Sequence, residues 1–112
     1  MQSMDYLKKM IEKQTDLQNK MLAKYAYAFH SNEDYILQNA RWTQDELSEL
    51  IRALGPFNKP WKHGDIDIDK VKEEAIDVLH FLLNIFIALD MDAEDIYNTY
   101  IQKNEKNYKR FL

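Results

Sequence analysis

The sequence predicts an all-α protein, on three observations. Its 112 residues include only two glycines and two prolines, so long stretches lack any residue that breaks a helix. Apolar residues recur at alternating steps of three and four, which is the spacing of one helix face. Hydrophobic residues make up 46% of the chain, enough for one core at this length. We therefore expect a single domain, residues 1–112, with four main helices.

The composition also narrows the function. The chain has no cysteine, which excludes disulfides and thiolate metal sites. Its start does not resemble a signal peptide, and its longest apolar run, residues 78–89, is too short to span a bilayer. We expect a cytoplasmic protein that does not contact a membrane. The net charge of −4 argues against binding to nucleic acid, which favours a basic face.

The first helix is expected from Met4 to Phe29. Gln14 and Gln18 interrupt its apolar seam. One interpretation is that these amides bond each other or water at the edge of the seam. The other is that they point into a pocket and bind the polar edge of a ligand, since each carboxamide has both donors and acceptors.

The second helix is expected over residues 34–54 as one continuous helix, although Thr43 and Glu46 have the spacing of a capping box that would begin a new helix. Gly55-Pro56 ends it. The loop that follows, residues 55–66, contains two aromatic residues and two lysines: Phe57, Lys59, Trp61 and Lys62. The simple interpretation is that these two rings anchor the loop to the core, and we expect at least one of them to do so. The functional interpretation is that a ring stacks on a base and a lysine meets a phosphate.

The third helix is expected to begin near Asp67 or Asp69 and to end near Leu89. Its second half is apolar all round, which predicts the central buried helix. Asp92 is expected to cap the last helix, residues 93–111. On that helix one face carries two cations and an amide, with a second amide beside it: Lys103, Asn107, Arg110 and Asn104. This face is either simply solvated, with basic residues near the C-terminal end of the helix, or it binds phosphate.

Two acidic pairs, Glu46/Glu49 and Glu74/Asp77, lie on the second and third helices. Residues three apart on a helix share a face, so each pair directs two carboxylates the same way. Unpaired charges at the edge of a core are costly, and we expect no nearby lysine to form an ion pair with these carboxylates. Four converging carboxylates are suited to Mg²⁺, which prefers oxygen ligands. The pattern predicts a metal-dependent nucleotide hydrolase.

His80 and Asn84 continue the polar line of the third helix. A lone His or Asn on an apolar face is usually a satisfied core residue. His80, however, follows Asp77 by one turn, so we expect it to orient that carboxylate, and we place Asn84 and Asn104 in the same supporting layer.

In combination these segments resemble the all-α nucleoside triphosphate pyrophosphohydrolases, which include the MazG-type enzymes and the dimeric dUTPases. The resemblance is closer to the dimeric dUTPases and covers most of the chain. The segments that carry it, in chain order, are Gln14-Thr15-Asp16-Leu17-Gln18, Glu46-x-x-Glu49, Phe57-Asn58-Lys59-Pro60-Trp61-Lys62, Glu74-Ala75-Ile76-Asp77-Val78-Leu79-His80-Phe81 and Tyr100-x-x-Lys103-Asn104-x-x-Asn107-x-x-Arg110.

The resemblance implies hydrolysis of a nucleoside triphosphate, dUTP by expectation, to the monophosphate and pyrophosphate. It implies that Glu46, Glu49, Glu74 and Asp77 bind two or more Mg²⁺ ions, and that Glu49 orients or deprotonates the attacking water. Lys103, Asn107 and Arg110 would hold the phosphates with Lys59 or Lys62, while Gln14, Gln18 and Trp61 would contact the base. Gln18 stands where the family usually has Asn. The implied fold is a helical bundle completed by oligomerisation, as a homodimer or homotetramer.

Three alternatives stay open. One is a MazG-like pyrophosphohydrolase of dCTP or a non-standard nucleotide. A di-iron carboxylate bundle would need two Glu-x-x-His pairs, whereas this chain has only Asp77-x-x-His80. A catalytically silent helical interaction module would need no converging carboxylates.

Overall fold

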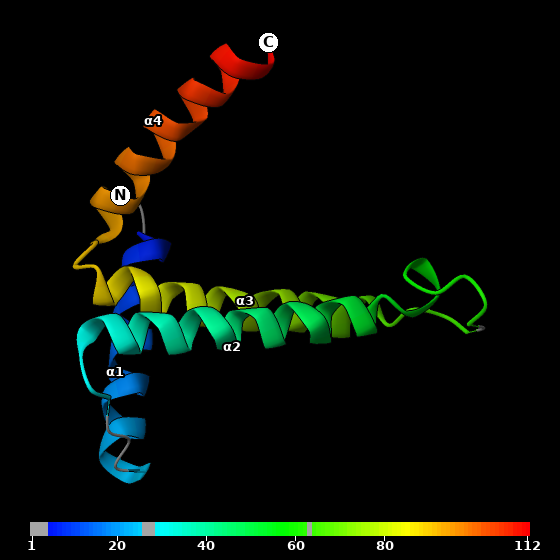
Figure 1. Ribbon diagram of the computed structural model, residues 1–112, viewed down its shortest axis with the longest axis horizontal. Helices are drawn as coiled ribbons and strands as arrows, with labels where there is room; N and C mark the ends of the chain where they lie inside the picture. Colours follow the sequence, from blue (N-terminus) through cyan, green and yellow to red (C-terminus); the bar gives the residue numbers. More distant parts are fainter. Residues whose placement is uncertain (1–4, 26–28, 63) are drawn as a thin grey trace. The chain divides into compact units, whose positions relative to one another are not determined.

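The computed structural model describes residues 5–25, 29–62 and 64–112. All the secondary-structure elements in these ranges are helices (Figure 1). In chain order these are α1 (Tyr6–Tyr25), α2 (Asn32–Ala53), the short 3-10 helix η1 (Gly55–Phe57), α3 (Ile68–Ala88) and α4 (Ala93–Phe111). The described residues contain no β-strand, which confirms the predicted all-α class with four main helices. No helix in those ranges combines the length and apolar character that crossing a membrane requires.

The chain groups into two compact units. One unit, residues 28–85, contains α2, η1, the long loop and most of α3. The other unit comprises residues 1–27 and 86–112, and in it α1 contacts α4. A single domain over the whole chain stays a prediction.

Local capping explains where α2 begins and ends. The Ser31 hydroxyl accepts a hydrogen bond from the Asp34 amide at 3.0 Å, so the helix begins at Asn32, two residues before the predicted start. Thr43 starts no new helix, because its hydroxyl donates to the Asn39 carbonyl one turn back at 2.8 Å. The predicted continuous helix is therefore confirmed. Gly55 ends it with a φ of +45°, a conformation that glycine adopts without a steric cost.

The other helix ends also follow from short-range chemistry. Asp67 accepts from the Lys70 amide at 3.2 Å, so α3 begins at Ile68. Asp92 and Asp95 form a reciprocal capping box that begins α4, as predicted. The predicted first helix is longer than α1 at both ends, and its positions Met4 and Ala28 lie outside the described residues.

Within residues 28–85, α2 and α3 run antiparallel and side by side (Figure 1). The Asn84 amide donates to the Asn39 side-chain oxygen at 2.9 Å, and the rings of Trp42 and Phe81 lie 6.0 Å apart. Phe29 adds an edge-to-face contact with Trp42, at 6.3 Å between ring centroids.

The apolar core of the chain is thin. Leu83 is the one fully buried apolar residue among those described, and Ile76 on α3 is 51% exposed. In the apolar second half of α3, Leu83 and Asn84 are buried and the other side chains, apart from the exposed His80, are half-buried, so the predicted central buried helix is found only in part. Apolar side chains that stay partly exposed favour covering by further neighbours.

Candidate metal centre

Three carboxylates meet between α2 and α3. One oxygen from each of Glu46, Glu74 and Asp77 lies within 4.8 Å of the other two. Glu46 comes from the middle of α2, and the other two come from consecutive turns of α3. Glu46 and Glu74 are half-buried while Asp77 is exposed, so the cluster is open to solvent on one side.

The pairing of the two helices explains this convergence. Asn39 faces Asn84 and Trp42 faces Phe81, and the next step along both helices brings Glu46 to Asp77. The steps of three and four residues are those of a continuous seam between two packed helices. The seam thus changes from amides to aromatic rings to carboxylates as it approaches the loop.

Glu49 occupies the next position of this seam on α2, but it does not join the cluster. Its carboxylate accepts from the Arg52 guanidinium one turn later, and its side chain is 51% exposed. The structure therefore brings together three of the four predicted metal ligands. The roles predicted for Glu49, as a ligand and as the residue that activates water, stay predictions.

Electrostatics in the cluster favour a cation. The pKa of Glu46 is raised, chiefly because partial burial removes water from its carboxylate. The negative charges of Asp77, Glu74, Glu49 and Asp45 raise it further, in that order. Glu49 therefore contributes to the negative potential at Glu46 although it lies outside the three-residue group.

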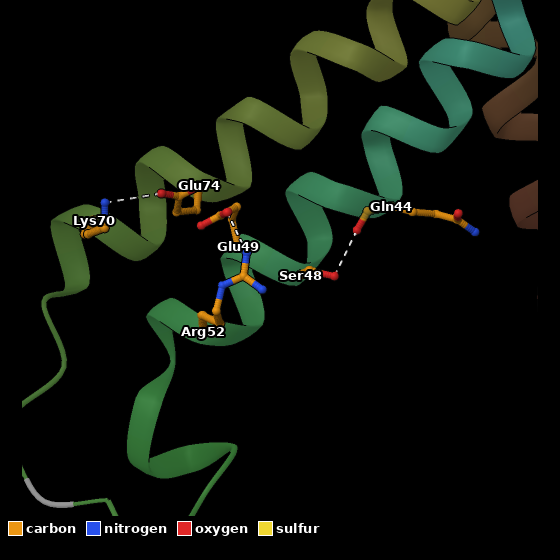
Figure 2. Close-up of polar contacts among 6 residues, drawn as sticks. All are labelled: Gln44, Ser48, Glu49, Arg52, Lys70 and Glu74. Carbon is orange, nitrogen blue, oxygen red and sulfur yellow. Dashed lines mark hydrogen bonds and ion pairs between the residues drawn. The ribbon is translucent and has the colours of Figure 1, made fainter.

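Two cations flank the carboxylates, which corrects the expectation that none would. Lys70 lies 3.3 Å from Glu74 on α3, and Arg52 pairs with Glu49 on α2 (Figure 2). Both cationic side chains are more than 60% exposed, at 61% and 63%. The Arg52–Glu49 pair is exposed on both sides and contributes about 0–1 kcal/mol, so a divalent ion can displace it at little cost. Glu74 is 13% exposed, so its pair with Lys70 is partly buried. The spacings of both pairs, three and four residues on one helix, were readable in the sequence.

The donor set suits Mg²⁺, a hard cation that carboxylate oxygens bind. The three oxygens lie within 4.8 Å of one another, so small side-chain rotations would let Glu46, Glu74 and Asp77 hold one such ion.

Space for a ligand adjoins Asp77. An open hollow of about 350 Å³ on α3 is lined by Lys72, Glu73, Ile76 and Asp77. It shares Asp77 with the cluster, while its other three lining residues are not cluster members.

The two polar residues that follow Asp77 on α3 differ in their surroundings. His80 is exposed, and its role in orienting Asp77 stays a prediction. Asn84 is 2% exposed and bonds Asn39, two seam positions away from the carboxylates. Sequence reasoning missed Asn39, although its position, seven residues before Glu46, places it on the same face of α2.

The 3-10 helix η1 and the loop that follows it present two aromatic rings to solvent. Phe57 is 77% exposed and Trp61 is 72% exposed. The expectation that at least one of them anchors the loop to the core is therefore wrong. Backbone turns order this segment instead, including a 2.9 Å bond from the Lys62 amide to the Lys59 carbonyl. Lys59 and Lys62 are exposed, and the predicted base and phosphate contacts of the loop stay predictions.

The remaining predicted site residues belong to the unit of residues 1–27 and 86–112. Gln14 is 4% exposed, and Gln18 is half-buried with its amide 3.8 Å from the Met21 sulfur. Their burial places both amides on the packed seam of α1. Buried amides in proteins are generally hydrogen-bonded. The predicted contact of both amides with a base is not tested by their burial.

On α4, in the same unit, Lys103 and Arg110 are exposed while Asn104 and Asn107 are half-buried. The Arg110 guanidinium lies 5.1 Å from the centre of the Phe111 ring. Both interpretations of this face, solvated or phosphate-binding, fit these positions.

Comparison with known proteins yields one family and several relatives. The model of a family described as dUTPase matches residues 6–93. A dCTP pyrophosphatase of Enterobacteria phage T4 is 28% identical, over 95% of this chain and 80% of its own. A dCTP pyrophosphatase of Enterobacteria phage LZ5 is 32% identical, over 71% of this chain and 56% of its own. No solved structure matches significantly.

A third relative is longer. A DNA replication protein of Enterobacteria phage T4 is 27% identical over 90% of this chain, and the match spans 34% of that protein. The chain thus spans from about a third to four fifths of the length of these curated relatives.

Proposed function

This chain belongs to the dUTPase family of nucleoside triphosphate pyrophosphohydrolases, and on that premise we propose that it hydrolyses a deoxyribonucleoside triphosphate to the monophosphate and pyrophosphate. The observation that carries the proposal is the meeting of Glu46, Glu74 and Asp77 within 4.8 Å at an open edge of a helix pair. The family match includes all three residues, as well as the loop with Trp61.

We propose dUTP or dCTP as the substrate. The description of the family favours dUTP, and the names of the two phage relatives favour dCTP. On their pairing edges, uracil presents an N3–H donor and an O4 acceptor, whereas cytosine presents an N3 acceptor and an N4 amino donor. A carboxamide has both kinds of atom, so Gln14 and Gln18 suit either base after rotation of the amide. Trp61 would stack on the base, for which its exposed ring is suited.

The carboxylates would hold Mg²⁺, with Glu46, Glu74 and Asp77 as ligands and Glu49 joining them once it leaves Arg52. Bound Mg²⁺ would neutralise the triphosphate and lower the pKa of the attacking water. Glu49 would orient that water and accept its proton. Its exposed position at the end of the seam is compatible with this, because water reaches the carboxylate directly.

Lys103, Asn107 and Arg110 would hold the phosphates, with Lys59 or Lys62 in support. Lysine and arginine donate to phosphate oxygens through charge-assisted hydrogen bonds, and amide groups add neutral donors. The exposure of both lysines of the loop leaves them available for this contact. His80 would orient the Asp77 carboxylate, and Asn84 and Asn104 would likewise support the residues of the site without touching the reacting atoms.

We further propose a homo-oligomer, a dimer or a tetramer. Three apolar residues of α2 lie at helical spacing on one face and are nearly half-exposed, namely Leu37 at 48%, Leu47 at 43% and Ile51 at 47%. An apolar stripe of this kind costs free energy in water and is typical of a surface that another chain covers. The thin core of the single chain supports the same proposal.

A turnover screen tests the function. The purified chain is incubated with dUTP, dCTP, dTTP and the four ribonucleotides, with Mg²⁺ or with a chelator, and pyrophosphate is measured separately from phosphate. We expect Mg²⁺-dependent pyrophosphate release, fastest with dUTP or dCTP. If no nucleotide is hydrolysed and Mg²⁺ leaves the melting temperature unchanged, a helical interaction module becomes the better account.

A further inference from the structure

Two asparagines form the most deeply buried polar contact in the unit of residues 28–85. Asn39 is 0% exposed and Asn84 is 2% exposed. The Asn84 amide nitrogen donates to the Asn39 side-chain oxygen at 2.9 Å, which joins α2 to α3. The amide nitrogen of Asn39 in turn donates to the Tyr35 carbonyl at 2.9 Å, so the orientation of this side chain is determined by its own helix.

This contact is directional, whereas its neighbours in the seam are not. The tilted contact between the rings of Trp42 and Phe81 tolerates sliding better, because dispersion and burial are non-directional. Sliding α3 by one turn, about 5.4 Å, breaks the asparagine bond and leaves two buried amides without each other. Each buried polar group that loses this partner destabilises the shifted arrangement. A buried Asn pair therefore selects one register among several that the apolar contacts allow.

The register it selects is the one that assembles the carboxylates. Glu46 follows Asn39 by seven residues on α2, and Asp77 precedes Asn84 by seven residues on α3. Seven residues are about two helical turns, so Asn39 and Glu46 point the same way, and so do Asn84 and Asp77. Any displacement of the asparagine pair is transmitted unchanged to the carboxylates, since both helices are continuous between them.

We propose that Asn39 and Asn84 are positioning residues, whose hydrogen bond sets the register of α2 on α3 and thereby the spacing of Glu46 from Glu74 and Asp77. The consequence for Mg²⁺ affinity rests on the proposed function, but the consequence for register does not.

Four variants separate positioning from stability. Asn39→Leu and Asn84→Leu each leave one buried amide without the other. The double variant replaces both amides by apolar groups of similar size, which can be nearly neutral for stability. The control is Leu83→Ala, because Leu83 is 3% exposed beside Asn84 and its truncation loosens packing without touching the amide bond.

For each variant, the melting temperature and the Mg²⁺ concentration that half-saturates activity are measured. We expect both single variants to melt lower and the double variant to recover most of that loss. The half-saturating Mg²⁺ concentration should nevertheless rise about tenfold in the double variant, the usual size of such supporting effects on a metal site. Leu83→Ala should melt lower with an unchanged Mg²⁺ requirement. A double variant with the wild-type Mg²⁺ requirement overturns the proposal.

A second measurement keeps this test independent of the metal. The chain has no cysteine, so Ser48→Cys on α2 and Lys72→Cys on α3, both at exposed positions, accept spin labels cleanly. We expect one narrow label-to-label distance in the parent chain and a broadened or second distance after both asparagines are replaced. An unchanged narrow distance refutes the positioning role, whereas a parent chain that binds no Mg²⁺ refutes only the proposed function.

Discussion

Neutralising Glu46 should stabilise the metal-free protein. The side chain lies within 4.8 Å of Glu74 and Asp77, and Glu46→Gln removes its repulsion with both while keeping its shape. Two unit charges 4.8 Å apart repel by about 0.9 kcal/mol in a medium as polar as water and by about 3.5 kcal/mol at a dielectric constant of 20. The cluster is open to water, so the lower value applies. The expected gain is about 2 kcal/mol at low salt and about 1 kcal/mol at physiological ionic strength.

The sign of the pH dependence follows from the raised pKa of Glu46, whose main cause is burial. The unfolded chain loses this proton at lower pH than the folded chain does, so stability falls as pH rises through the ordinary and then the raised value. The advantage of Glu46→Gln should therefore be present at pH 7 and absent below about pH 4. Thermal unfolding with a chelator, at both pH values, measures it, and each kcal/mol corresponds to roughly 4 °C.

Mg²⁺ should reverse the order of stability, so that the wild-type protein melts higher than Glu46→Gln. A bound cation stabilises the wild-type protein in proportion to the logarithm of its concentration over Kd, and Glu46→Gln loses a ligand. The matched control is Asp45→Asn, because Asp45 is the weakest of the named charges acting on Glu46 and is exposed. It should change the melting temperature little and keep the Mg²⁺ response. If Glu46→Gln melts no higher than wild type in chelator at pH 7, the carboxylates do not repel one another as the structure indicates.

Three further outcomes are expected. Glu49→Gln should lower kcat by about 10²–10⁴-fold with an unchanged circular dichroism spectrum, since Glu49 is half-exposed and its loss removes a proton acceptor; near-normal turnover would refute its role. Trp61→Ala should raise KM roughly tenfold at constant melting temperature, while Phe57→Ala, an equally exposed aromatic, should change KM less; equal effects would remove the stacking role of Trp61. Asp90→Gly should raise the free energy of unfolding by about 1 kcal/mol, because Asp90 has a φ of 59° at the end of α3; a lower melting temperature would show that its side chain matters more than its backbone.

Much of the local structure was readable from the chain because it depends on neighbours within four residues. Ser31, Asp67 and Asp92 cap the helices where capping chemistry places them, and Gly55 ends α2. The Glu-x-x-Glu and Glu-x-x-Asp spacings likewise follow from the pitch of a helix. The pairing of Lys70 with Glu74 was equally local, although it was not foreseen.

Exposure was harder to predict. Phe57 and Trp61 are the kind of residue that usually anchors a loop, and both lie in solvent. The apolar second half of α3 predicted a buried helix, yet Leu83 and Asn84 are its only fully buried members among the described residues. Apolar composition states what a side chain prefers, whereas burial depends on how many other elements surround it.

The sequence by itself determined four helices, the caps of α2, α3 and α4 and two acidic faces, since each of these obeys rules that act within a few residues. Only the tertiary structure decided that Glu46 meets Glu74 and Asp77 while Glu49 turns to Arg52, and that Asn39 bonds Asn84. The reason is that contacts between helices depend on register. Register is selected by directional bonds between residues 45 positions apart in the chain, which no local pattern encodes.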